Sequence, residues 1–116
     1  MLFNAQSEID IHEQSPLALA FVGDGVLEVL VRQRCVGRTR LVPGKLHAMA
    51  VKFVSAKGQF AALQHIEPML TEEEQGLVRR GKNATKASVA KHATPQEYRA
   101  STGLECLFGY LDRKST

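Results

Sequence analysis

The sequence has no apolar run as long as the roughly 18 to 20 uninterrupted residues that a transmembrane helix needs. The best candidate begins at Leu17, and Asp24 and Glu28 interrupt it. Residues 1–14 contain acids where a signal or transit peptide would carry bases, so no secretion or import address is visible. We therefore expect a cytoplasmic protein that has no membrane partner.

Cysteine and histidine are too few and too scattered to indicate a zinc site. Cys35 and Cys106 lie in apolar helical patterns without metal-ligand spacing, and the four histidines have no mutual zinc spacing either. Both cysteines are therefore interpreted as reduced core residues rather than as a disulfide. No serine or cysteine has a matched base in the sequence that would favour covalent catalysis.

Strand patterns of convincing length and internal repeats are also absent, so the sequence predicts an all-α fold. With 116 residues, of which 44% are apolar and 23% charged, the chain has the size and composition of one globular domain. We expect that domain over residues 15–113, after an N-terminal extension at 1–14 and before a short tail at 114–116.

Helix-start and helix-stop signals predict four helices, at about residues 16–35, 45–66, 71–81 and 94–112. Gly81 is interpreted as the end of the third helix. The polar stretch that follows Gly81 has no clear periodicity, so it is predicted to be a long loop.

The first predicted helix differs from an ordinary surface helix. Its apolar residues surround the helix axis, so we expect it to be buried on most sides, in part against another subunit. Gly23 and Gly25 weaken a helix by about 1 kcal/mol each relative to alanine. Their presence predicts that a neighbouring backbone approaches this helix closely.

Two carboxylates fall within otherwise apolar helical surfaces. Asp24 lies on an apolar stripe of the first helix, with Glu28 one turn later, and Glu105 lies in the same way on the last helix. A buried, unpaired carboxylate costs several kcal/mol, so each should have a partner. Acids that converge from two helices suit a hard divalent cation such as Mg²⁺. The alternative is that each acid forms an ion pair with a nearby base, such as Arg32 or Arg99. The spacing of the residues does not distinguish a metal site from ion pairs.

A basic stretch begins in the last turn of the third predicted helix and continues beyond it. No acid occurs between Glu74 and Glu97, whereas five bases do: Arg79, Arg80, Lys82, Lys86 and Lys91. Such a stretch suits a polyanion, although an exposed loop kept soluble by lysine has the same composition. Lys57, on the second helix, is a further candidate for phosphate contacts, but helices routinely carry such lysines on their solvent face.

Four segments, in this order, resemble the ribonuclease III endonuclease family, in its reduced form, Mini-ribonuclease III: LALAFVGDGVLEVLVR, KLHAMAVKFVSAKGQ, RRGKNA and YRASTGLECLFGYL. The resemblance covers nearly the whole chain after Ser15. It implies the helical fold of the ribonuclease III endonuclease domain and a homodimer. It also implies Mg²⁺-dependent hydrolysis of double-stranded RNA, with Mn²⁺ able to substitute, that leaves 5′-phosphate and 3′-hydroxyl ends.

By position, the resemblance makes Asp24 and Glu105 the catalytic, metal-binding acids. Longer family members carry further acids in places that Leu17, Ala20 and Thr102 occupy here. The implied carboxylate shell is therefore thin. Glu28 and Thr102 are candidates for residues that contact the metal-binding acids but not the metal itself. Glu28 could also position the attacking water.

The resemblance further implies maturation of the 23S ribosomal RNA precursor, in a bacterial cytoplasm or a plastid stroma, with a ribosomal protein as a partner that presents the RNA. Because the chain ends before a double-stranded-RNA-binding domain could begin, we expect the basic stretch to hold the substrate. Two alternatives stay open. A non-catalytic RNA-binding or ribosome-assembly dimer on the same scaffold would not need the acid pair. An all-α nucleotide pyrophosphohydrolase would need E-x-x-E and E-x-x-D clusters, of which the chain offers only TEEE.

Overall fold

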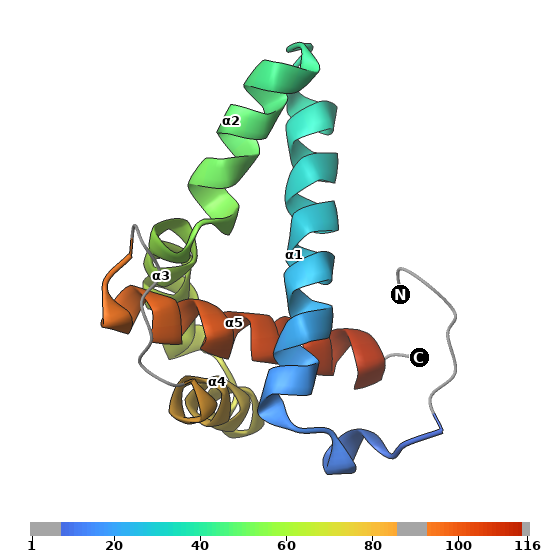
Figure 1. The fold of residues 1–116 in the computed structure, drawn as a ribbon, viewed down its shortest axis with the longest axis vertical. Coiled ribbons are helices and arrows are strands. Elements are labelled where there is room, and N and C mark those ends of the chain that lie inside the picture. Colours follow the sequence, from blue (N-terminus) through green and yellow to red (C-terminus); the bar gives the residue numbers. More distant parts are fainter. Residues whose placement is uncertain (1–7, 86–92, 115–116) are drawn as a thin grey trace.

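The computed structural model describes residues 8–85 and 93–114 of the chain. Over these residues the fold is all-α, as predicted, and contains no strand (Figure 1). Its elements are η1 (Ile11–Glu13), α1 (Pro16–Arg38), α2 (Pro43–Val54), α3 (Ala56–Ile66), η2 (Glu67–Met69), α4 (Glu72–Ala84) and α5 (Pro95–Lys114). None of these helices is long and apolar enough to cross a membrane.

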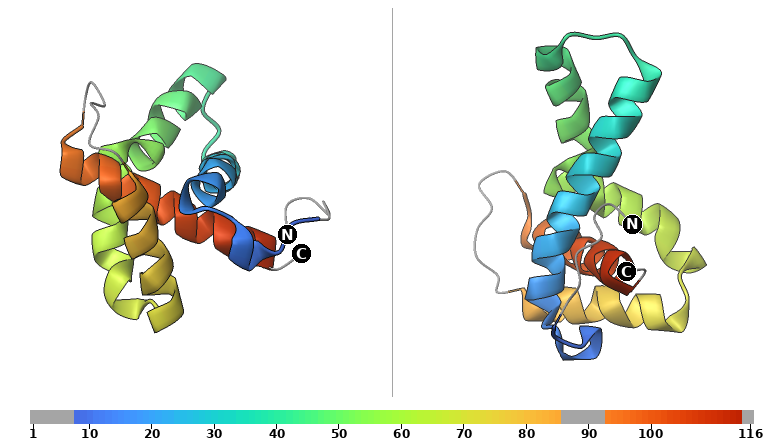
Figure 2. Two further views of the ribbon diagram at one scale, coloured as in Figure 1. Left: turned by 60° about the horizontal axis from the view of Figure 1, so that its bottom comes forward. Right: turned by 90° about the vertical axis from the view of Figure 1, so that its right-hand side faces the viewer.

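The last helix, α5, is the centre of the fold. It packs against α1, α3 and α4, and the second half of α1 projects away from it together with α2 (Figures 1 and 2). The core residues are Leu19, Ala20, Leu63, Leu77, Val78, Ala100, Leu104, Cys106, Leu107 and Tyr110. Half of these belong to α5, so this helix rather than α1 is enclosed by its neighbours. Cys35 and Cys106 are both buried and free, as expected.

The prediction that the first helix is buried on most sides is wrong for the single chain. One face of α1 packs on α5, and several large apolar side chains elsewhere on α1 are exposed. Phe21 is 84% exposed and Leu17 is 52% exposed. Helical periodicity identifies apolar positions but cannot tell whether the chain itself or a second subunit covers them.

Local capping signals fix the helix starts. The Ser15 hydroxyl accepts a hydrogen bond from the Ala18 backbone N–H (3.0 Å), and Thr71 forms a capping box with Glu74. Thr94 exchanges the same pair of hydrogen bonds with Glu97 at the start of α5. The predicted starts of these three helices are confirmed.

The predicted single helix over 45–66 is wrong, because the chain turns at Ser55 and forms α2 and α3. Ser55 has an extended backbone conformation, and its hydroxyl accepts a hydrogen bond from the Gly58 N–H (3.1 Å). At Gly58 an added Cβ would overlap the Lys52 carbonyl, so the turn requires the absence of a side chain there. The apolar spacing continues across the turn, which explains why periodicity missed it.

The interpretation of Gly81 as a helix end is also wrong, since α4 continues to Ala84. A Cβ at Gly81 would lie 2.8 Å from the Gly103 Cα atom and 2.9 Å from the Cys106 Cβ atom. This glycine therefore permits close packing of α4 on α5 rather than a helix stop. As a consequence, Lys82 belongs to the same helix as Arg79 and Arg80, and not to the loop predicted after Gly81.

Candidate active site

The site begins where the backbones of α1 and α5 touch. A Cβ added to Gly23 would overlap the Glu105 carbonyl oxygen, and one added to Gly109 would overlap the Leu19 carbonyl oxygen. Two glycines, one on each helix, thus allow an approach that any side chain would prevent. The close approach predicted for Gly23 is confirmed, whereas a Cβ on Gly25 would meet no atom within 4 Å.

This contact brings together the two acids that the sequence singles out. Asp24 directly follows Gly23, and Glu105 lies at the contact itself. Burial raises the pKa of Glu105 to about 7, and the negative charge of Asp24 adds to the rise, whereas a hydrogen bond from Gln59 opposes it. The two carboxyl groups are therefore close enough to repel each other when both are ionised, and to share a hydrogen bond when Glu105 holds a proton.

The setting of Asp24 differs from the expected one. Asp24 is exposed, so it does not carry the burial cost that its apolar neighbours suggest. Neither acid has a basic partner within residues 8–85 and 93–114. Arg32 instead bonds Glu28 (Nε to Oε2, 3.0 Å). The alternative of two structural ion pairs is thus not what the described part of the chain shows.

Gln59 is a polar member of the site that the sequence analysis missed. It is 3% exposed, and its Nε2 donates hydrogen bonds to the Val54 carbonyl (2.9 Å) and to Glu105 Oε2 (3.2 Å). Its Oε1 is buried and has no partner among the described residues. The only signal in the sequence was a glutamine four residues before Leu63, on the face of α3 that packs inward.

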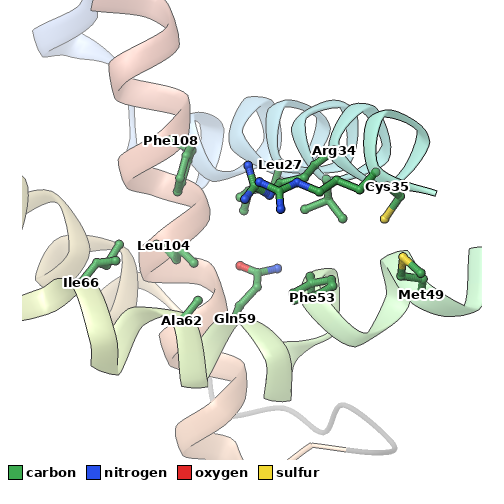
Figure 3. A pocket seen from close by; sticks show the side chains of 12 residues that line it. Leu27, Arg34, Cys35, Met49, Phe53, Gln59, Ala62, Ile66, Leu104 and Phe108 are labelled. Carbon is green, nitrogen blue, oxygen red and sulfur yellow. The ribbon is translucent and has the colours of Figure 1, made fainter. Parts of the chain in front are cut away.

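A largely apolar pocket of about 430 Å³ lies between α1, α2, α3 and α5 (Figure 3). Gln59, which bonds Glu105, is part of its lining, and so are Arg34 and Arg38. Its apolar lining includes Leu27, Val31, Met49, Phe53, Leu104 and Phe108. Figure 3 shows the Gln59 amide extending into this space from α3. Leu104, which directly precedes Glu105, also lines this pocket, and burial is the largest cause of the raised pKa of Glu105.

Glu28 and Thr102, the candidates for contacts to the metal-binding acids, form hydrogen bonds to other residues. Glu28 forms the surface pair with Arg32 described above. Thr102 is 7% exposed, and its hydroxyl donates to the Tyr98 carbonyl of its own helix (3.2 Å). Their roles in catalysis stay predictions.

The basic candidates are distributed over α3 and α4. Arg79 and Lys82 line a groove of about 660 Å³ together with Glu67, to which the Lys82 Nζ atom is bonded (3.5 Å). Arg80 is exposed on α4, and its charge opposes the rise in the pKa of Cys106 and of Tyr110 on α5. Lys57 is exposed in the first turn of α3. Lys86 and Lys91 lie outside the described residues.

Two of the three acids of the TEEE segment, Glu73 and Glu74, form structural bonds. Glu74 completes the capping box, accepting from the Thr71 N–H (2.8 Å), and Glu73 accepts a hydrogen bond from the Tyr110 hydroxyl (2.6 Å) and pairs with Lys114. The Tyr110 and Lys114 bonds lower the pKa of Glu73. This segment is therefore not the metal cluster that a pyrophosphohydrolase would need.

The acid pair fits a divalent cation. Two converging carboxylates that have no basic partner among the described residues offer the hard oxygen ligands that Mg²⁺ prefers, and a cation would relieve their repulsion. No group of three or more His, Cys, Asp or Glu side chains that could hold a metal occurs in the described part of the chain. Such an ion would thus have two protein carboxylates, with water and substrate oxygens as its other ligands.

Comparison with known proteins agrees with this geometry. The ribonuclease III domain matches residues 17–112, and the chain belongs to the ribonuclease III family. Within that family it is similar to proteins named Mini-ribonuclease 3. It is 48% identical over 96 residues to the one from Symbiobacterium thermophilum, covering 83% of this chain and 74% of that protein. It is 42% identical over 104 residues to the one from Enterococcus faecalis, covering 88% and 79% respectively.

A solved structure shares the fold. The crystal structure of a protein from Fusobacterium nucleatum superposes with a TM-score of 0.84 at 29% sequence identity, over 93% of this chain and 88% of that one. The family resemblance read from the four sequence segments is confirmed. Membership of the ribonuclease III family identifies the chain as an endoribonuclease, as the sequence predicts.

The raised pKa of Glu105 predicts how stability depends on pH. An ordinary glutamate ionises near 4.5 and Glu105 near 7, so between these values the folded state holds a proton that the unfolded state has lost. Without metal, stability should therefore fall as the pH rises from about 4.5 to about 7, with the loss complete above that range. Glu105→Gln removes this loss. We expect the difference in melting temperature between this variant and the wild type to grow as the pH rises through this range, when both are measured in EDTA by circular dichroism. A difference that stays constant with pH would contradict the prediction.

Proposed function

We propose that this endoribonuclease depends on Mg²⁺ and cleaves double-stranded RNA, with Asp24 and Glu105 as the acids that hold the cation. The observation that carries the proposal is the glycine-mediated contact of α1 and α5, which brings together two carboxylates that have no basic partner in residues 8–85 and 93–114. The names of its relatives, which describe ribonucleases, support the same substrate class. Mn²⁺ can take the place of Mg²⁺, because both accept carboxylate oxygens.

The reaction is hydrolysis of a phosphodiester bond. A water attacks the phosphorus in line with the leaving 3′-oxygen, the bond from phosphorus to that oxygen breaks, and 5′-phosphate and 3′-hydroxyl ends result. A bound divalent cation supplies charge stabilisation of the phosphoryl oxygens and a more acidic water. For this chain, Asp24 is accessible to substrate, and Glu105 must lose its proton before it can act as a ligand. Activity is therefore expected to require a pH near or above the pKa of Glu105.

The active form is a homodimer in which each chain supplies one site and the two sites cut opposite strands. The exposed apolar side chains of α1, led by Phe21 and Leu17, support this proposal. A surface of this kind on a helix that also carries an active-site acid is typical of a protein interface. The dimer would then bury α1 on the sides that the single chain leaves open.

The RNA is held by basic side chains of the catalytic domain, residues 15–113. Arg79, Arg80 and Lys82 of α4, with Lys57 of α3, contact phosphates. Lys86 and Lys91, which lie outside the described residues, are proposed as further phosphate contacts. A-form RNA is recognised mainly by shape, through phosphate and 2′-hydroxyl contacts, which basic side chains on a helical domain can provide.

Replacing Arg79 and Arg80 by alanine is expected to weaken RNA binding and to reduce its salt dependence. Each lost phosphate contact should lower the slope of log affinity against log salt by about 1. Lys114→Ala is the matched control, because Glu73 already pairs with that charge. RNA affinity is measured by fluorescence anisotropy over a series of salt concentrations. If the double variant has the same slope of log affinity against log salt as the wild type, these arginines do not contact the RNA.

The natural substrate that we propose is the precursor of 23S ribosomal RNA, in the cytoplasm, with a ribosomal protein as a partner that presents the RNA. Support comes from the bacterial relatives named Mini-ribonuclease 3, whose matches cover 83%, 88% and 91% of this chain. Glu28 and Thr102 are also proposed to help position the acid pair without contacting the cation themselves. Glu28 lies one helical turn after Asp24.

The test of the function is incubation of purified protein with a long double-stranded RNA in Mg²⁺, in Mn²⁺ and in EDTA. Cleavage should occur with either ion, stop in EDTA and leave single-stranded RNA of the same sequence intact. RNA that is bound but uncut with both ions would overturn the proposal and favour a non-catalytic RNA-binding dimer. The small number of carboxylates at the site in the described residues would then explain the lack of cleavage.

A further inference from the structure

We propose that Gln59 is a positioning residue that holds the Glu105 carboxylate in place beside Asp24, an inference that rests on the function proposed above. Its Nε2 group donates to Glu105 Oε2 at 3.2 Å, across 46 positions of the sequence. The side chain comes from α3, whereas Asp24 belongs to α1 and Glu105 to α5. A third helix thus fixes the orientation of an acid at the contact of the other two.

The turn at Ser55 explains how Gln59 is itself held. In an uninterrupted helix the Val54 carbonyl would accept a hydrogen bond from the Gly58 N–H. The Ser55 hydroxyl takes that N–H instead (3.1 Å), which leaves the Val54 carbonyl without a helical partner. Gln59 Nε2 fills the vacancy at 2.9 Å. The helix break is therefore what anchors the amide.

The two acceptors also determine which way the amide points. Both the Val54 carbonyl and the Glu105 carboxylate need a donor, so the nitrogen and not the oxygen of Gln59 must face them. The two N–H bonds of Nε2 are then both used. In Figure 3 the amide lies between Phe53 and Leu104, and no described side chain bonds its oxygen.

A purely space-filling role does not explain a glutamine at this position. A buried amide with an unpaired oxygen costs stability relative to an apolar side chain of the same size. Apart from Arg34 and Arg38, the other residues that line the pocket beside it are apolar, and an apolar side chain at position 59 would suit that part of the lining better. The bond to Glu105 is the interaction that such a replacement would lose. Groups that orient metal ligands typically change metal affinity or activity by about 10- to 100-fold when removed.

The test compares Gln59→Met with the wild type under the conditions in which the wild type cleaves double-stranded RNA. Methionine keeps the length of the side chain and removes both N–H donors. We expect kcat to fall by about 10- to 100-fold and the Mn²⁺ concentration for half-maximal activity to rise, while KM for RNA stays within about two-fold. Mn²⁺ affinity measured by electron paramagnetic resonance without RNA should fall in parallel, which gives a readout besides activity.

Tyr110→Phe is the control for the loss of one partly buried hydrogen bond between side chains of different helices. It removes the hydroxyl that donates to Glu73, with no change of shape, and it should leave kcat and Mn²⁺ affinity unchanged. Gln59→Asn, which keeps an amide but withdraws it by one methylene group, serves as a second variant if the methionine protein does not fold, and the same losses are expected. Wild-type activity and Mn²⁺ affinity in both Gln59 variants would overturn the inference. A wild type that does not cleave would instead overturn the proposed function.

Discussion

Gly23→Ala is expected to lower the free energy of unfolding by about 3 kcal/mol or more, the upper end of the usual cost of overpacking. The added methyl group would overlap the Glu105 carbonyl oxygen and come within 2.9 Å of the Gly109 backbone nitrogen. Both are main-chain atoms of the central helix, which cannot rotate away as a side chain could. A domain of this size has about 5 to 15 kcal/mol in total, so a large share of its stability depends on this glycine.

Gly76→Ala is the matched control for this experiment. Gly76 is also helical, but an added Cβ would meet only the end of the Arg79 side chain, at 3.7 Å. Its replacement should be neutral or should stabilise the chain by up to about 1 kcal/mol, through helix propensity. Urea denaturation followed by circular dichroism measures both variants. Equal stability of the two would mean that the contact of α1 and α5 is looser than the structure shows.

Asp24→Asn is expected to reduce kcat for cleavage of double-stranded RNA by about 1000-fold or more. Charge stabilisation by a bound cation contributes several kcal/mol to such reactions, and about 4 kcal/mol corresponds to 1000-fold. Asparagine keeps the shape of the side chain but not the negative charge that a divalent cation requires. Because Asp24 is exposed, the substitution leaves the core untouched, so the variant should fold and bind RNA as the wild type does.

Asp10→Asn provides the control for the loss of one aspartate charge. Asp10 caps η1, accepting from the His12 N–H (2.8 Å), and asparagine caps helices equally well. The activity of Asp10→Asn should equal that of the wild type. Gel-based cleavage assays and RNA-binding measurements on the three proteins complete the comparison. If Asp24→Asn retained more than about a tenth of the wild-type rate, Asp24 would not be a metal ligand.

Local signals predicted the starts of the helices well because capping is a local interaction. Ser15, Thr71 and Thr94 each accept the hydrogen bond that their positions imply. The ends were harder to predict. Gly81 looks like a helix stop in the sequence, but its role is decided by Gly103, which packs against it from another helix. Only the three-dimensional arrangement separates a packing glycine from a terminating one.

The acid pair was predictable and its surroundings were not. Asp24 and Glu105 stand out because carboxylates are rare on apolar helical faces, and the resemblance to a known family indicated the same two positions. Gln59 carries no such signal, since an isolated glutamine is ordinary in a helix and its bond to Glu105 crosses 46 positions. The exposure of Asp24 was also unpredictable, because apolar residues around α1 can be covered either by the chain or by a partner.

That Asp24 and Glu105 together hold one divalent cation is tested most directly by titrating Mn²⁺ into the protein and following free Mn²⁺ by electron paramagnetic resonance. The titration is done above the Glu105 pKa of about 7, where both acids are ionised. The wild type should bind Mn²⁺, and Asp24→Asn and Glu105→Gln should each bind it at least about ten-fold more weakly. Equal Mn²⁺ binding by all three proteins would contradict a shared metal site.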